Sequence, residues 1–122
     1  APLLAAGGGG AIVNVLSVLS WLNMSQIGGY CASKSAEWAL TNAVRNELRK
    51  QGTQVLAVHA AFIDTDMAGG VQAPKTAPED VARQLLDALE AGREEVLADD
   101  ISRGVRQLLG SEAPPYLREA AA

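Results

Sequence analysis

Residues 10–40 read GAIVNVLSVLSWLNMSQIGGYCASKSAEWAL, and the architecture of the chain can be worked out from the order of the pieces in this stretch. Residues 11–16 form a β-branched, mostly apolar run between glycine and serine, which is typical of a buried strand. Because the run lacks polar alternation, we expect both of its faces to be covered, as in a parallel sheet. Residues 17–29 have the composition of a loop, and apolar positions recur with helical spacing over residues 30–50.

The rest of the chain continues this alternation of strands and helices. The further predicted elements are strands at residues 54–59 and 95–98, a helix from Pro78 to its stop at Gly92, and a helix over residues 101–109. Strands that alternate with helices indicate a parallel sheet with right-handed crossovers. We therefore predict the α/β class, with a partial Rossmann-like (doubly wound) fold of about three parallel strands alternating with three helices.

The chain has the length of a single domain, because 122 residues leave little room for two. Residues 1–10 are predicted to be a flexible N-terminal segment and residues 110–122 a loose tail. The connection over residues 60–76 is longer than most loops, which indicates a binding loop. Because the chain begins at Ala1 rather than Met, we expect it either to begin inside a longer parent or to be processed.

Charge and composition exclude several classes of function. The net charge is −4 and the Lys and Arg residues are scattered, so we expect no nucleic-acid partner. The N-terminal stretch is too short and too rich in glycine to span a membrane, and it lacks the basic start of a signal peptide. Cys31 is the only cysteine, which excludes an intrachain disulfide and a Cys-based zinc site and fits a cytoplasmic protein.

Three side chains in the opening stretch can converge on one reaction. Tyr30 and Lys34 are four residues apart at the start of a helix, so they share one face. An ammonium beside a phenol favours the phenolate and lowers the phenol pKa from about 10, which suits Tyr30 to general acid–base work. Ser17 follows the first strand, and sites in parallel α/β sheets form at the carboxyl ends of strands.

The wider context of these residues matters, because an isolated Tyr-x-x-x-Lys pair occurs by chance in many helices. Ser17 stands thirteen residues before Tyr30, and Asn14 precedes Ser17 in an Asn-x-x-Ser pattern at the end of the strand. This strand, loop and helix resemble the catalytic segment of the short-chain dehydrogenase/reductase family. By that resemblance, Tyr30 transfers the hydroxyl proton, Lys34 lowers the Tyr30 pKa and bonds the nicotinamide ribose, and Ser17 polarises the substrate oxygen. Asn14 is interpreted as structural.

The resemblance extends downstream into the segment VHAAFIDTDM at residues 58–67. It implies that Ile63 and Thr65 occupy positions that contact the nicotinamide carboxamide and the phosphates of NAD or NADP. Ala60 and Ala61 stand where the family usually has Pro-Gly, a change that alters loop geometry and removes no functional group. The loop over residues 66–76 would then be a substrate lid.

The resemblance covers residues 9–109 and only the C-terminal half of the family's fold. No G-x-x-x-G-x-G fingerprint follows a strand, because Gly7–Gly10 precede the first strand. We therefore expect binding of NAD or NADP to be weak or absent. The first strand would have an open edge and the helix over residues 30–50 an open apolar surface. In the family this helix also packs at a dimer interface, so we expect a homo-oligomer.

Three functions remain open. The leading one is an NAD(P)-linked oxidoreductase of a small carbonyl or alcohol substrate. The second is a cofactor-independent serine hydrolase acting on esters, with Ser17 as nucleophile and Tyr30 with Lys34 as base. The third is a catalytically inactive, truncated oligomerisation module.

Other candidate residues have simpler interpretations. His59, the only histidine, is expected to be structural, and Trp21 and Trp38 to line a pocket or an interface or, for Trp38, to pack in the core. Four acidic residues could suggest a metal site: Asp64, Asp66, Asp99 and Asp100. No metal site is expected, because these residues are divided between two loops and are interpreted as solvated loop caps.

Overall fold

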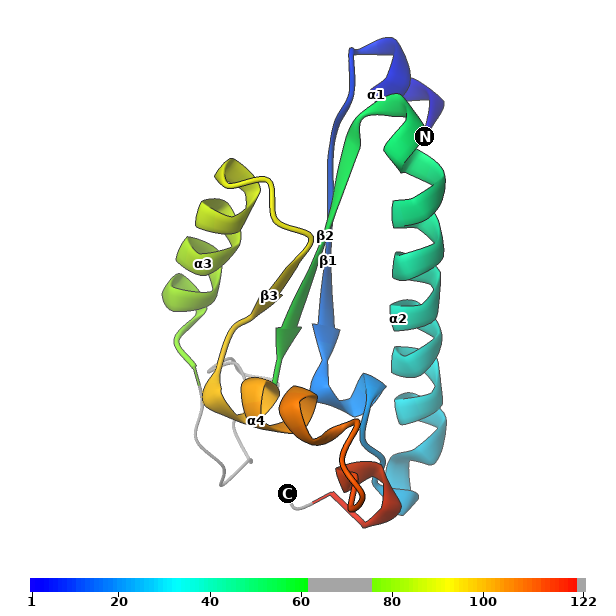
Figure 1. The fold of residues 1–122 in the computed structure, drawn as a ribbon, viewed down its shortest axis with the longest axis vertical. Coiled ribbons are helices and arrows are strands. Elements are labelled where there is room, and N and C mark those ends of the chain that lie inside the picture. Colours follow the sequence, from blue (N-terminus) through cyan, green and yellow to red (C-terminus); the bar gives the residue numbers. More distant parts are fainter. Residues whose placement is uncertain (62–75, 121–122) are drawn as a thin grey trace.

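The protein is described by a computed structural model that covers residues 1–61 and 76–120. Its centre is a parallel sheet in the order β1 (Gly10–Ser17), β2 (Thr53–Ala60) and β3 (Glu95–Leu97) (Figure 1). The connecting helices are α2 (Gly28–Leu48) and α3 (Pro78–Glu90), and α4 (Asp100–Leu108) follows β3. The predicted α/β class and the partial Rossmann-like fold with three parallel strands are confirmed.

The central strand, β2, is covered on both faces. Leu56, Val58 and Ala60 pack with Val81 and Ala88 of α3 in the apolar core. Because side chains alternate along a strand, the intervening residues of β2 face the other way, toward α2. Figure 1 likewise shows α2 and α3 on opposite sides of the sheet.

The two crossover connections cannot have the same hand. When strands advance in one direction across a parallel sheet, crossovers of one hand place their helices on one face. Here the order is β1-β2-β3, and α2 and α3 cover opposite faces. The prediction that every crossover is right-handed is therefore wrong for one of the two. Because α2 and α3 lie on opposite faces, β2 is covered on both sides and almost the whole strand is buried.

Local signals explain where the helices begin and end. Pro78 occupies the first turn of α3, followed by Glu79 and Asp80 at its positive end. Asp99 caps α4, and its Oδ1 accepts a hydrogen bond of 2.7 Å from the backbone N–H of Ser102. After α2 and the 3₁₀ turn η3 (Arg49–Gln51), Gly52 takes the left-handed conformation with φ of 71° and redirects the chain into β2.

Both terminal segments contain short helical elements, which the sequence did not predict. A short helix, α1 (Pro2–Ala6), lies within the N-terminal segment expected to be flexible, because proline starts it and leucine and alanine favour helix. The tail expected to be loose contains the 3₁₀ turn η5 (Pro115–Leu117). Beyond η5, the backbone N–H of Ala120 donates to the carbonyl oxygen of Asn23 at 3.0 Å. Such long-range hydrogen bonds leave no trace in local composition.

Helix length and polarity also bear on membrane crossing. Among the residues described, no helix is both long and apolar enough to cross a bilayer.

Candidate active site

Ser17 ends β1 and begins the 3₁₀ turn η1 (Val18–Ser20). Its Oγ accepts a hydrogen bond of 3.1 Å from the backbone N–H of Leu19, and the Ser20 hydroxyl donates to the Ser17 carbonyl oxygen. Ser35 of α2 donates to the carbonyl oxygen of Ser20 at 2.8 Å, which ties the turn to the helix. The contact with Leu19 uses a lone pair of Ser17 Oγ, so its hydroxyl hydrogen is free for an outside acceptor.

Tyr30 and Lys34 lie on the first turns of α2. The Lys34 Nζ is 5.6 Å from the centroid of the Tyr30 ring and 3.2 Å from Oε2 of Glu37. Tyr30 is 50% exposed, so its hydroxyl is accessible to a ligand. Gly28 and Gly29 precede it, and a side chain at either position would meet nothing within 4 Å, so the helix start is open. The ammonium therefore lies beside an accessible phenol.

The three predicted catalytic residues share one end of the sheet. The carboxyl end of β1, where Ser17 lies, and the amino end of α2, where Tyr30 and Lys34 lie, are neighbours in Figure 1. This is the end at which ligands bind in open parallel sheets. Ile63 and Thr65, predicted to contact the cofactor, lie outside the described residues, as does most of the expected lid.

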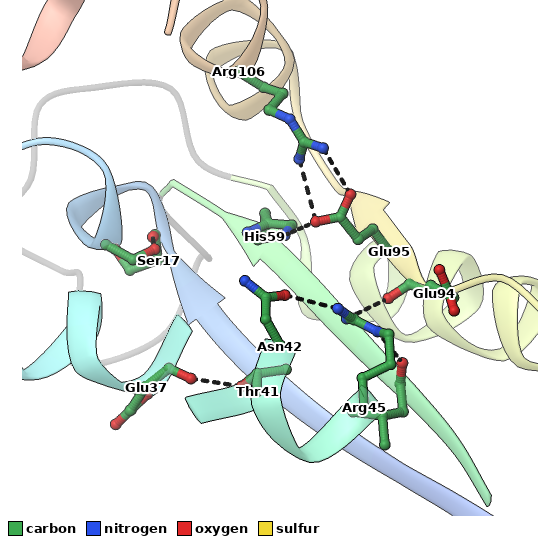
Figure 2. A network of polar contacts seen from close by, with 11 residues as sticks. Ser17, Glu37, Thr41, Asn42, Arg45, His59, Glu94, Glu95 and Arg106 are labelled. Carbon is green, nitrogen blue, oxygen red and sulfur yellow. Dashed lines mark hydrogen bonds and ion pairs between the residues drawn. The ribbon is translucent and has the colours of Figure 1, made fainter. Parts of the chain in front are cut away.

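Asn14 takes the structural part expected of it. Its Nδ2 donates to Thr41 Oγ1 at 3.0 Å. The Thr41 hydroxyl in turn donates to the carbonyl oxygen of Glu37 at 2.6 Å (Figure 2). This chain of hydrogen bonds fixes β1 against α2 at Thr41, about two helical turns beyond Lys34. It therefore sets the distance between the strand that carries Ser17 and the helix that carries Tyr30.

Sequence reasoning missed Arg45, which it grouped with the charges at the basic end of the helix. Arg45 is buried and bonds three oxygens: the carbonyl of Val55 at 3.1 Å, the side chain of Asn42 at 2.7 Å and the carbonyl of Glu94 at 3.0 Å (Figure 2). These contacts tie α2 to β2 and to the start of β3. The spacing of Arg45 four residues after Thr41, on the same helix face, is the signal that could have found it.

His59 has the structural character expected of it. It is fully buried at the end of β2, where its Nε2 lies 3.2 Å from Oε1 of Glu95. Burial lowers the pKa of His59, although the carboxylate of Glu95 opposes this shift. Burial alone would raise the pKa of Glu95, but the hydrogen bond from Arg106 holds it below its usual value.

The remaining candidate residues have different surroundings, and Asp64 and Asp66 lie outside the described residues. Trp21 is buried, and Trp38 meets it edge-on with ring centroids 6.1 Å apart. Asp99 caps α4 and also accepts a hydrogen bond of 2.8 Å from the backbone N–H of Ala61, so its interpretation as a loop cap is confirmed. Within residues 1–61 and 76–120, no group of three or more potential ligand residues is arranged to hold a metal ion.

Comparison with known families identifies the family of the chain. The sequence profile of the family described as short chain dehydrogenase matches residues 1–76, which is more than half of the chain. The chain belongs to the short-chain dehydrogenase family. The two segments that carried the resemblance, around Ser17 to Lys34 and at residues 58–67, both fall inside the matched region.

Two curated relatives give the extent of the likeness. The chain is 48% identical over 61 residues to the 3-beta-hydroxysteroid dehydrogenase of Comamonas testosteroni, which covers 48% of this chain and 24% of the relative. It is 31% identical over 111 residues to the 2-dehydro-3-deoxy-D-gluconate 5-dehydrogenase of Dickeya dadantii, covering 91% of this chain and 42% of the relative. The chain thus spans less than half the length of these dehydrogenases.

A solved structure shows the same arrangement. The crystal structure of a short chain dehydrogenase from Burkholderia cenocepacia in complex with NADP superposes with a TM-score of 0.83 at 34% identity. The superposition covers 91% of this chain and 46% of that protein. The strands and helices described above therefore correspond to about half of a complete member of the family.

Proposed function

We propose that this chain forms the catalytic part of an NAD(P)-linked oxidoreductase that interconverts a small alcohol and the corresponding carbonyl compound. One observation carries the proposal: the Lys34 ammonium lies 5.6 Å from the Tyr30 ring centroid, at the end of the sheet where Ser17 ends β1. The NADP complex of the relative from Burkholderia cenocepacia supports this class of cofactor.

In the proposed reaction, each of the three side chains acts on the substrate oxygen or on its proton. The Tyr30 phenolate takes the hydroxyl proton when an alcohol is oxidised, and the phenol returns it when a carbonyl is reduced. The Lys34 ammonium, 5.6 Å from the Tyr30 ring centroid, stabilises the negative charge that develops on the Tyr30 oxygen during the transfer. Ser17 donates its hydroxyl hydrogen to the substrate oxygen and stabilises the charge that develops there. The hydride that balances this proton transfer is the chemistry that a bound nicotinamide supplies.

The described residues fit one end of a dinucleotide. The Tyr30 hydroxyl and the Lys34 ammonium are donors suited to the hydroxyl groups of a nicotinamide ribose, and Tyr30 is half exposed. The glycine run over residues 7–10 ends at Gly10, the first residue of β1, so at about 3.3 Å per residue Gly10 lies about 23 Å along the strand from Ser17. Phosphates bind beyond the carboxyl ends of strands, so this run does not serve them. We therefore expect weak cofactor binding.

The test uses the 122-residue chain and titrates NADH and NADPH by the fluorescence of the reduced nicotinamide. We expect dissociation constants on the order of 1 mM and weaker binding by Lys34→Met, because the ammonium contact is lost. Lys50→Met is the matched control, since Lys50 lies after the far end of α2. Failure of both cofactors to bind at several times this concentration would contradict the proposal for this chain.

Hydrolysis of p-nitrophenyl esters, measured in parallel, separates the other two functions. Ester turnover that disappears in Ser17→Ala, without any cofactor binding, would favour a serine hydrolase that uses Tyr30 and Lys34 as base. The absence of both activities would favour an inactive oligomerisation module.

We also propose that two copies of the chain associate through α2 and the edge of β1. A groove of about 380 Å³ runs between them, lined by Val13, Asn14, Val15, Leu16, Glu37, Leu40, Thr41 and Val44. Val15 is 50% exposed and Leu40 is 64% exposed. An edge strand presents unpaired backbone groups to a second strand, and β1 carries no charged side chain that would repel its own copy.

A further inference from the structure

Ser17 and Trp21 belong to one hydrogen-bonded unit. Ser17 is the N-cap of η1, and its Oγ accepts from the backbone N–H of Leu19 at 3.1 Å. The backbone N–H of Trp21 donates to the carbonyl oxygen of Val18 at 2.9 Å and closes the turn. A displacement of Trp21 is therefore transmitted to the Ser17 hydroxyl over a single turn of backbone.

The Trp21 indole is held by residues from three different elements. His59 of β2 stacks on it, with ring centroids 4.4 Å apart and 26° between the planes. Trp38 of α2 meets it edge-on, and the guanidinium carbon of Arg106 on α4 lies 5.5 Å from the indole centroid. Trp21 is only 7% exposed as a result. Its place in the site thus depends on the relative positions of the sheet and two helices.

Glu95 joins the two polar neighbours of the indole. Its Oε1 lies 3.2 Å from His59 Nε2. Both carboxylate oxygens also accept hydrogen bonds from the Arg106 guanidinium, Oε1 at 3.3 Å and Oε2 at 2.9 Å (Figure 2). In Figure 2, Arg106 lies above the Glu95 carboxylate and His59 lies to its left. A two-pronged contact of this kind fixes direction as well as distance.

We propose that Arg106, Glu95 and His59 are positioning residues that hold Trp21, and through it the Ser17 hydroxyl, in the geometry of the candidate site. The inference rests on the proposed role of Ser17. By this inference, a residue of α4, close to the C-terminal end of the chain, fixes the position of the Ser17 hydroxyl at the end of β1. None of the three residues is assigned a contact with substrate.

The chemistry of position 106 distinguishes positioning from simple packing. An apolar side chain could cover the Trp21 ring as well as Arg106 does. Only a planar guanidinium can lie over an indole while bonding both oxygens of Glu95. Burial lowers the pKa of His59, so the imidazole is neutral and stacks on Trp21 without a charge of its own.

The experiment measures amide hydrogen exchange by NMR in the 122-residue chain. The reporter is the N–H of Leu19, which is bonded to the Ser17 hydroxyl oxygen, and the reference is the N–H of Leu56 in the buried strand β2. We expect Arg106→Gln to accelerate exchange at Leu19 about tenfold and to leave Leu56 nearly unchanged, because only the local unit loosens. Arg106→Lys should also accelerate amide exchange at Leu19, because lysine keeps the charge but cannot bond both oxygens of Glu95 with a planar group.

Arg103→Gln is the matched control. Arg103 lies on the same helix, pairs with Asp100 at 2.7 Å and donates to the carbonyl oxygen of Leu97, so its loss should not change Leu19 exchange. Unchanged Leu19 exchange in both Arg106 variants would overturn the proposal, as would equal acceleration at Leu56, which would mean a general loss of stability.

Glu95→Gln supplies an independent measurement if an Arg106 variant fails to fold. It should also accelerate amide exchange at Leu19, and unchanged exchange in that variant would overturn the proposal. Amide exchange requires no turnover or cofactor. Its result is therefore separate from that of the cofactor titration, and either proposal can fail without the other.

Discussion

The imidazole of His59 is fully buried, and its Nε2 lies 3.2 Å from Oε1 of Glu95. Despite this carboxylate, burial holds the pKa of His59 below its ordinary value of 6.5, and the cationic Arg106 and Arg45 act in the same direction as burial. The hydrogen bond from Arg106 holds the pKa of Glu95 below 4.5 against the effect of burial. The folded state therefore resists protonation at both residues.

Stability should consequently fall as the pH is lowered. Below pH 6.5 the unfolded chain binds a proton at His59 that the folded chain resists, so the free energy of unfolding decreases until the pH reaches the folded pKa. A second decrease begins below pH 4.5, where the unfolded chain protonates Glu95. Urea unfolding between about pH 4 and pH 8 measures both. His59→Asn should remove the upper decrease alone, and an unaltered profile in that variant would contradict the assignment.

Arg45 should contribute far more to stability than its neighbour Arg49. Replacing Arg45 by Met leaves one buried and two partly buried hydrogen bonds without their charged donor, and we expect the free energy of unfolding to fall by about 2–3 kcal/mol. Arg49 forms an exposed ion pair with Glu94, so Arg49→Met should cost less than about 1 kcal/mol. Urea denaturation of the two variants gives the comparison, and equal losses would show that burial of Arg45 is unimportant.

Tyr30→Phe should abolish proton transfer while leaving the helix intact, because only the hydroxyl is removed. In assays of NADP reduction with small secondary alcohols, we expect kcat to fall about 100- to 10,000-fold with little change in KM. Tyr116→Phe is the matched control, since Tyr116 is a similarly exposed tyrosine in η5. A rate that survives in Tyr30→Phe would exclude Tyr30 as the acid–base group.

Charges introduced into the proposed interface should separate the copies. Val15→Lys and Leu40→Lys place an ammonium on the edge of β1 and on α2, where it would be desolvated by a partner. Light scattering after size exclusion should give an oligomer for the unmodified chain and a monomer for both variants. Leu86→Lys on α3, a position 58% exposed on the opposite side of the sheet, should keep the oligomer. A monomeric unmodified chain would refute the association.

Local patterns predicted the secondary structure well. The strand expected at residues 11–16 is β1 (Gly10–Ser17), and the helix expected over residues 30–50 is α2 (Gly28–Leu48). These predictions succeed because apolar periodicity and helix-stopping glycines act over a few neighbouring residues. The same locality allowed the spacing of Ser17, Tyr30 and Lys34 to be interpreted as a candidate site, and their catalytic roles stay a prediction.

Long-range contacts escaped the same reasoning. Arg45 looks like any helix-terminal charge in the sequence, and its burial depends on the carbonyl oxygens of Val55 and Glu94, ten and forty-nine residues away. The contact of Ala120 with Asn23 and the placement of α3 opposite α2 are likewise invisible to local patterns. Each depends on which surfaces meet after the chain has folded.

The division follows from the range of the forces involved. Residue order alone was enough to predict the strands and helices, because each depends on neighbours along the chain, and their alternation indicated the parallel sheet. The grouping of Ser17, Tyr30 and Lys34 in one reactive site stays a prediction. Only the tertiary structure decided on which faces of the sheet the helices pack and that Arg45 is buried. It also decided that His59 and Arg106, joined by Glu95, contact the Trp21 ring. Those features arise where segments distant in sequence exclude water together, and packing selects the partners.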